Sequence, residues 1–219
     1  MYNQFLVEDK SSEQLIDILM QKFTLMYPDT IYNCKSFHGI GGFTKKNTVK
    51  ETKTGHLLND LATYLRGFNK SLQNFPSVIV IVLDNDDSNT DELRNSLEQV
   101  ANQNMITVDH VFCIAVEEVE AWLLGDHEAI ASAYPNVKQS VLHSYVQDSI
   151  CGTWETLADA IYPGGYPKLM KNAVSYRAIG IIKAEWSKNI AVYMKFDSNN
   201  SPSFNYFFSE LQRRAAVTN

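Results

Sequence analysis

Short apolar runs alternate with longer amphipathic stretches in the first half of the chain. The clearest run is residues 78–83, VIVIVL, and residues 111–116 form a second one. Runs that are apolar at nearly every position are typical of strands covered on both faces, as in the interior of parallel sheets. Residues 2–7 and 30–37 predict two further strands, the second of them weaker. The pattern therefore predicts a central, mainly parallel sheet with residues 78–83 in its interior.

Between the predicted strands, apolar residues recur at helical spacing. Residues 15–26 and 57–68 each carry such a stripe, which predicts a helix on either side of the second strand. Ser11 or Ser12 is predicted to cap the first helix, and Pro28 to end it. The alternation of strands and helices indicates an α/β fold.

The last third of the chain has no comparable strand pattern. Beyond Pro135 it is predicted to be mostly helical, with a helix within residues 179–194 and a last helix capped by Ser203. We therefore expect an α/β core over residues 1–135, with a central, mainly parallel sheet flanked by helices. A helical C-terminal extension over residues 136–219 is expected to pack on this core, and the two parts are expected to form one structural domain.

Carboxylates follow three of the predicted strands. Glu8 follows the first strand, Asp84 and Asp86 follow the central run, and Glu118 and Glu120 follow the last run. Parallel strands bring their carboxyl ends to one edge of a sheet, where open α/β sheets bind ligands. If the central strand continues through both aspartates, their side chains point to the same face. Carboxylate oxygens suit Mg²⁺ or Mn²⁺, and such cations can activate a water for phosphodiester hydrolysis.

These acidic residues allow other interpretations. A calcium-binding EF-hand would need Gly where Asn89 stands and Glu where Asn95 stands, so this interpretation fails. A dehalogenase-type phosphatase would need its nucleophilic Asp on the first strand. Two structural interpretations stay open: the acidic turn after the central run caps the next helix, and the later acids open a helix whose dipole favours them, namely Glu117, Glu118 and Glu120.

The charge balance limits how this chain can bind nucleic acid. A net charge of −6 argues against a broad basic surface that binds nucleic acid by counterion release alone. It does not argue against a nuclease, because bound cations offset metal-binding carboxylates locally. One basic stretch is interpreted first as a solvated loop and second as a weak nucleic-acid contact, through Lys45, Lys46, Lys50 and Lys53.

Cysteine usage and hydropathy indicate the compartment. Cys34, Cys113 and Cys151 are an odd, scattered set, which suggests reduced thiols and neither a disulfide framework nor a zinc module. The chain shows no secretory signal pattern, and no apolar segment approaches the roughly 18 residues of a membrane helix. The sequence therefore predicts a cytoplasmic protein without a membrane partner.

Two groups of motifs carry a resemblance to a known domain. The segment FLVE, which ends at Glu8, and the segment VIVLDND, which holds Asp84 and Asp86, together resemble the TOPRIM domain of topoisomerases, primases and OLD-type nucleases. The segment VEEVEAWLLGD at residues 116–126, with SPSF at residues 201–204, is similar to a family of small uncharacterised bacterial TOPRIM-like proteins. Members of that family are often encoded beside AAA-type ATPases in phage-defence settings.

The resemblance implies a site and an activity. It implies that Asp84 and Asp86 bind Mg²⁺ or Mn²⁺, that Glu118 completes the site, and that Glu8 is a ligand or the general base. The expected activity is endonucleolytic cleavage of DNA or RNA in phage defence, with an AAA-type ATPase as partner. Two further acids are second candidates for the site: Glu120 and Asp126.

The chain departs from the family at one position, because Asp9 stands where the first motif commonly has Gly after its Glu. An Asp there restricts the backbone and can crowd a cation. This departure favours an alternative function, a catalytically silent TOPRIM-like binding or regulatory subunit that docks on an ATPase. The sequence leaves open DNA or RNA as substrate, and monomer or homodimer as the assembly.

Overall fold

The computed structural model describes residues 1–41 and 55–217 of the chain. The lysines expected to contact nucleic acid weakly lie outside the described residues: Lys45, Lys46, Lys50 and Lys53.

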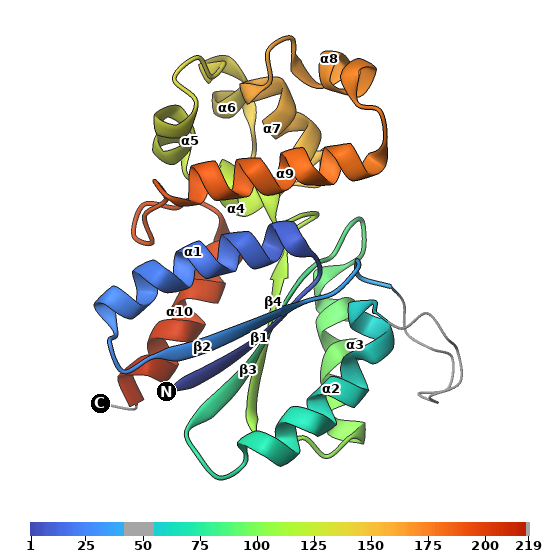
Figure 1. Cartoon of the computed structure of the whole chain (residues 1–219), viewed down its shortest axis with the longest axis vertical. Coiled ribbons are helices and arrows are strands. Elements are labelled where there is room, and N and C mark those ends of the chain that lie inside the picture. The colour runs from blue at the N-terminus through green and yellow to red at the C-terminus, as the bar shows by residue number, and fades with distance from the viewer. Residues whose placement is uncertain (42–54, 218–219) are drawn as a thin grey trace.

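An all-parallel sheet of four strands forms the centre of the fold (Figure 1). Its strands are β1 (Tyr2–Val7), β2 (Ile31–Ser36), β3 (Ser77–Asp84) and β4 (Asp109–Ala115), in the order β2-β1-β3-β4. The prediction that the apolar run lies inside the sheet is confirmed, because β3 pairs with β1 on one side and β4 on the other. Successive side chains of β3 enter two different hydrophobic clusters, which explains why nearly every position is apolar.

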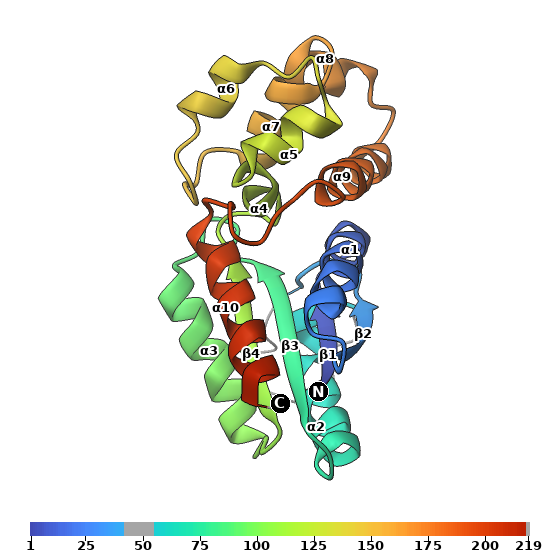
Figure 2. The same ribbon diagram turned by 90° about the vertical axis from the view of Figure 1, so that its left-hand side faces the viewer.

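Helices cover both faces of the sheet, so the α/β fold class is confirmed. The helices α2 (Leu57–Leu72) and α3 (Thr90–Gln103) cover one face. On the other face lie α1 (Lys10–Met26) and the last helix, α10 (Pro202–Val217), as Figure 2 shows from the side. The arrangement is that of a Rossmann-like sheet with helices on both faces.

The remaining helices lie beyond the carboxyl edge of the sheet (Figure 1). Their bounds are α4 (Glu120–Leu124), α5 (His127–Ala133), α6 (Gln139–Ser144), α7 (Thr153–Ile161), α8 (Gly165–Asn172) and α9 (Tyr176–Ala191). Both views show α9 beside α1, and the two helices contact each other extensively. In the described residues, no helix is both long and apolar enough to span a membrane.

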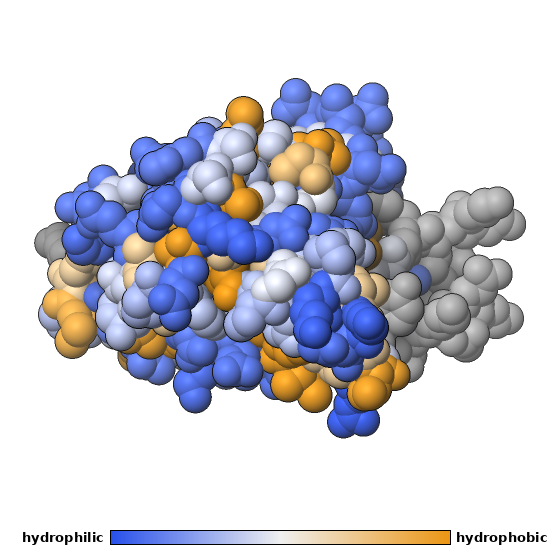
Figure 3. Space-filling view, turned by 90° about the horizontal axis from the view of Figure 1, so that it is seen from above, coloured by the Kyte–Doolittle hydropathy of each residue, from blue (hydrophilic) through white to orange (hydrophobic). Residues whose placement is uncertain are grey.

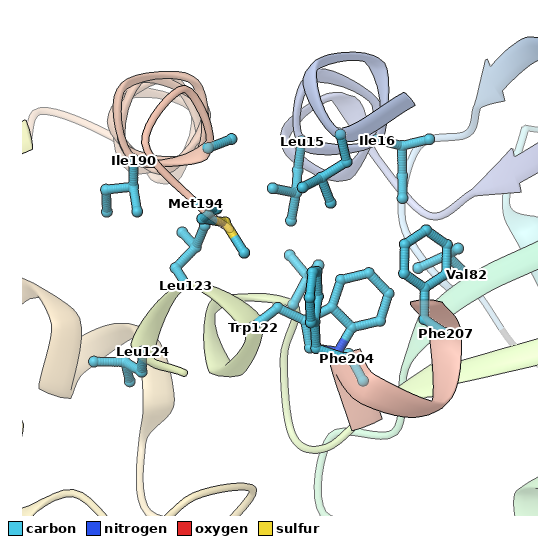
Figure 4. Packing of buried hydrophobic residues seen from close by; sticks show 14 of the residues in the cluster. Leu15, Ile16, Val82, Trp122, Leu123, Leu124, Ile190, Met194, Phe204 and Phe207 are labelled. Atoms are coloured by element: carbon cyan, nitrogen blue, oxygen red, sulfur yellow. The ribbon is translucent and has the colours of Figure 1, made fainter. Parts of the chain in front are cut away.

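One hydrophobic cluster joins the sheet to the helical extension. Trp122 of α4 is fully buried and stacks on Phe207 of α10, with 4.9 Å between ring centroids. Its indole Nε1 donates to the Ser203 hydroxyl at 3.0 Å. Figure 4 shows these rings facing Leu15 of α1 and Val82 of β3. The extension therefore packs on the core through shared side chains.

Two predicted helix caps are wrong. Asp9 caps α1, because its carboxylate accepts from the Ser12 backbone N–H at 2.9 Å, and Ser11 and Ser12 already lie within the first turn. The helix begins earlier than predicted because it follows the tip of β1 almost directly. Likewise α10 begins at Pro202, so Ser203 lies within it and the Ser201 hydroxyl accepts from the backbone N–H of Phe204.

Candidate functional site

The strand order places β1 next to β3 in the middle of the sheet. From there the chain proceeds outward to β2 on one side and to β4 on the other, so the direction of winding reverses between β1 and β3. In open α/β sheets, ligands bind at such a reversal, outside the carboxyl ends of the strands. Glu8 follows β1 and Asp84 ends β3, and the Asp84 backbone N–H donates to Glu8 Oε2 at 3.3 Å. The structure therefore brings the two together at the expected position.

Glu118 and Glu120 follow β4 at the same edge, where they meet a lysine from α9. The Lys183 Nζ lies 3.2 Å from Glu118 Oε1 and 3.3 Å from Glu120 Oε2. The Glu120 side chain is fully buried, and neither of its oxygens has a hydrogen-bond partner among the described residues. The ion pair with Lys183 is therefore the main interaction that offsets the cost of burying the Glu120 charge.

The charges of Glu8 on one side and of Glu120 and Lys183 on the other both act on Asp84. Burial raises its pKa well above the usual range, the charges of Glu8 and Glu120 raise it further, and Lys183 opposes them. We call Glu8, Asp84, Glu118 and Glu120 the carboxylate cluster.

Two members of the carboxylate cluster titrate near neutrality. Burial raises the pKa of Glu8 to about 7, although the hydrogen bond from the Asp84 backbone opposes the shift. Burial, followed by the charge of Glu120, raises the pKa of Glu118 to about 7, against the attraction of Lys183. Crowded, buried carboxylates disfavour their own ionisation. The carboxylate cluster therefore retains protons near pH 7 that a bound cation would displace.

Asp86 is placed differently from the sequence expectation. The strand ends at Asp84, and Asp86 is exposed in a turn with φ +48°, so the two side chains do not share a face by strand alternation. The turn forms because the Asn85 side chain is buried: it accepts from the Glu117 backbone N–H and donates to the carbonyl of Ser88. Asp86 still lies close enough for its charge to raise the pKa of Glu8.

The second candidate Asp126 caps a helix. Its Oδ1 accepts from the Ala129 N–H at the start of α5, and its Oδ2 accepts from the Lys195 N–H, both at 2.9 Å. Because the side chain is buried and both oxygens are used, Asp126 positions the backbone of the extension.

Glu117 also has a role that the sequence did not indicate. Its carboxylate accepts from the backbone N–H groups of Gly152 and Thr153, each at 2.9 Å, and from that of Cys151 at 3.0 Å. Burial raises its pKa, but these hydrogen bonds outweigh burial and the net pKa is lowered. Of the acids that could open the helix after β4, Glu120 does lie in the first turn of α4, whereas Glu117 instead caps the N-terminus of α7.

Asp9 does not strain the backbone at the position where the family commonly has Gly. Its φ is −149°, an extended conformation that any residue adopts, so no glycine is required there. The Ser11 hydroxyl donates to both oxygens of the carboxylate, which is held at the start of α1.

The donor chemistry of the carboxylate cluster fits a hard divalent cation. Its donor atoms are all carboxylate oxygens, and Glu120 Oε1 is buried without a partner in the part of the chain that the structure describes. Within that part, no three acidic, cysteine or histidine side chains are arranged as a ligand set. Mg²⁺ commonly binds through one or two carboxylates and several waters, and Glu8 and Asp84 would supply such a pair.

Comparisons of this chain with protein-family models, curated proteins and solved structures give no match. The TOPRIM-like identity therefore stays a prediction, and the interpretation of the site rests on its own geometry.

Lys183 is the residue of this site that sequence reasoning missed. It stands alone between Ile182 and Ala184 in a predicted helix, and a lysine among apolar residues is a weak signal for a buried ion pair. Its acidic partners lie more than 60 residues earlier in the chain. Only the packing of α9 over the sheet edge reveals the contact.

Proposed function

We propose that this protein is a Mg²⁺- or Mn²⁺-dependent nuclease that hydrolyses phosphodiester bonds in DNA or RNA. The observation that supports this proposal most is the convergence of four carboxylates on the winding reversal of the sheet, with Lys183 beside them. Such an edge is the usual ligand site of an open α/β sheet. Carboxylate oxygens favour hard cations such as Mg²⁺, and proteins commonly bind Mg²⁺ together with the phosphate groups of a substrate.

The residues of the carboxylate cluster would have different roles in phosphodiester hydrolysis. Glu8 and Asp84 would hold the cation, which supplies Lewis-acid activation of water and charge neutralisation when bound. Where Asp84 holds the cation without Glu8, Glu8 is instead available to accept the proton of the attacking water. Glu118, with a pKa of about 7, can hold or release a second proton. Lys183 fixes Glu118 and Glu120 and adds a positive charge at the edge where phosphate would bind.

The finer parts of the proposal rest on the sequence alone. The resemblance supports a TOPRIM-like fold, an AAA-type ATPase as partner and a role in phage defence, whereas cysteine usage and hydropathy support a cytoplasmic location.

The first experiment measures cleavage of single- and double-stranded DNA and RNA with Mn²⁺, by the protein alone and together with any AAA-type ATPase that is encoded beside it. We expect cleavage by the wild-type protein and a loss of about 10²- to 10⁴-fold in Glu8→Gln, since that change removes the ligand or the proton acceptor. Asp84→Asn is expected to abolish metal-dependent cleavage.

The matched control is Asp29→Asn, an exposed aspartate just before β2, at the opposite edge of the sheet. It should cleave like the wild type. Absence of cleavage of every substrate, with and without the ATPase, would overturn the nuclease proposal.

One observation favours a catalytically silent binding subunit as a second candidate. The Lys183 ammonium already pairs with Glu118 and Glu120, where it supplies positive charge without a metal. Calorimetry with Mg²⁺ and Mn²⁺ separates the two functions. A silent subunit would bind no cation, or would bind it equally well after Asp84→Asn, whereas the nuclease would lose binding in that variant.

A further inference from the structure

A groove of about 900 Å³ is lined by residues that neighbour the site in sequence, since Asp9 follows Glu8 and Ala184 follows Lys183. Its wall on one side is the start of α1, where Asp9 directly follows Glu8, and on the other side one face of α9. Phe37 and His38, which follow β2, also line the groove. The next residue, Gly39, donates its N–H to the Glu8 carbonyl at 3.0 Å, so this lining segment is bonded to the tip of β1.

The α9 face of the groove is lined at helical spacing. Arg177, Gly180, Ile181, Ala184 and Lys188 all line the groove, and their spacing places them on one stripe of the helix. A side chain at Gly180 would meet no atom within 4 Å, so the space beside it is open. Ala184 directly follows Lys183, so the stripe lies on the face of α9 next to the one that carries the partner of Glu118 and Glu120.

Two cations of this groove are free to bind an anion. Arg177 and Lys188 are exposed, and neither forms an ion pair within residues 1–41 and 55–217. By contrast, Lys10 is paired with Glu13, and the Asp9 carboxylate accepts hydrogen bonds at the start of α1. Eleven residues of helix separate the two free cations by about 16 Å, a length that covers several phosphates of one strand.

Beside these cations the groove presents Ile181, which is 62% exposed, and the exposed ring of His38. Polar and acidic side chains also line it, among them the exposed Glu185. Seen from above, the surface of the molecule is largely hydrophilic, with apolar side chains in separate groups (Figure 3). Free cations beside apolar and aromatic surface are what a nucleic-acid strand with unpaired bases requires.

We propose that this groove binds a single strand of nucleic acid and leads its backbone to the carboxylate cluster. Arg177 and Lys188 contact the phosphates, while Ile181 and His38 contact bases. A duplex is disfavoured because its bases are paired and stacked inward, which leaves the apolar side chains without a partner. This inference rests on the proposed nuclease function, and it names the substrate of the same site.

The test measures binding without cleavage. A fluorescent thymidine oligonucleotide of about 16 nucleotides is titrated with the full-length protein in EDTA, and anisotropy gives the dissociation constant. We expect Arg177→Gln together with Lys188→Gln to weaken binding at least about tenfold at roughly 50 mM salt. Because each lost phosphate contact reduces the salt slope for a single strand, the slope should become less negative by about 1.4.

Lys70→Gln is the matched control, since Lys70 is an exposed lysine in the last turn of α2, near the amino end of the sheet. This variant should bind like the wild type. An RNA oligonucleotide of equal length and a DNA duplex complete the comparison. Equal affinity for the duplex, or a double variant with unchanged affinity and slope, would overturn the inference.

The two proposals fail in distinguishable ways. If the wild type binds the oligonucleotide through Arg177 and Lys188 but cleaves nothing with Mn²⁺, the nuclease function fails and the groove assignment stands. If the wild type cleaves with Mn²⁺ but its binding does not depend on these two residues, the groove assignment fails alone.

Discussion

Single side chains connect the tips of the strands to the helices beyond them. Asn85 holds the turn after β3 against Glu117, which in turn holds the N-terminus of α7. The N-terminus of a helix carries unpaired N–H groups and a partial positive charge, and both are satisfied by the carboxylate. The next residue, Glu118, also accepts from α7, through the Trp154 N–H at 3.2 Å. The position of Glu118 in the carboxylate cluster thus depends on contacts with residues far along the chain.

Replacing Glu117 tests this connection. Glu117→Ala leaves the N–H groups of Cys151, Gly152 and Thr153 without their acceptor, so we expect a loss of about 1–3 kcal/mol in the free energy of unfolding at pH 7, measured with urea. Since the folded-state pKa of Glu117 is lowered, its contribution is present above the unfolded pKa and lost as pH falls through the folded pKa.

The control is Glu155→Ala, an acidic residue in the first turn of the same helix. It removes a favourable interaction with the helix dipole and should cost only about 0.3–1 kcal/mol. Equal losses in the two variants would contradict the capping role of Glu117.

At the scale of elements, α10 fixes the extension to the sheet. Phe207 is fully buried, stacks on Trp122 and lies 6.4 Å from the ring of Phe5 in β1. We expect Phe207→Ala to lower the free energy of unfolding by about 3–5 kcal/mol, because it removes a large side chain from a packed cluster. Urea denaturation followed by tryptophan fluorescence measures this change.

The neighbouring Tyr206 provides the comparison for Phe207. It is 38% exposed, and its ring lies against the Arg94 guanidinium, a contact worth about 0.5–1 kcal/mol at such a site. A loss in Phe207→Ala no larger than that in Tyr206→Ala would show that α10 does not pack on the sheet as described.

The strands were predictable from the sequence, and several connections were not. The apolar run of β3 encodes a strand buried on both faces, and a parallel sheet places Glu8 and Asp84 at the same edge; they meet because β1 and β3 are neighbours, which the sequence did not determine. Helix starts were predicted less well. Ser11 and Ser203 look like caps, but Asp9 and Ser201 precede them and accept the hydrogen bonds from the first-turn N–H groups. The contact of Lys183 with Glu118 depends on tertiary packing and leaves no local pattern.

At the scale of the whole molecule, assembling the carboxylate cluster lowers the free energy of unfolding. Each of its carboxyl groups titrates above its ordinary value, since burial and mutual repulsion disfavour the ionised forms. One lysine from α9 compensates part of this charge. The folded protein therefore binds protons or cations at this edge more strongly than the unfolded chain does.

This difference predicts how stability depends on pH. The pKa values of Glu8 and Glu118 are about 7 in the folded protein, against 4.5 for an unperturbed glutamate. Between these values the folded state holds more protons than the unfolded state, so the free energy of unfolding should fall as pH rises from 4.5 to 7. Urea denaturation in EDTA at about pH 5.5 and pH 7.5 measures the change.

A variant isolates the contribution of the carboxylate cluster from that of His127. Burial lowers the pKa of His127, so that residue stabilises the protein as pH rises and partly masks the effect. The double variant Glu8→Gln/Glu118→Gln retains His127 and loses both carboxyl groups. The wild type should therefore gain more stability than this variant on going from pH 7.5 to pH 5.5. Identical pH profiles for the two proteins would contradict the raised pKa values of the carboxylate cluster.

Mg²⁺ should stabilise the wild type more at pH 7.5 than at pH 5.5, because the cation competes with protons.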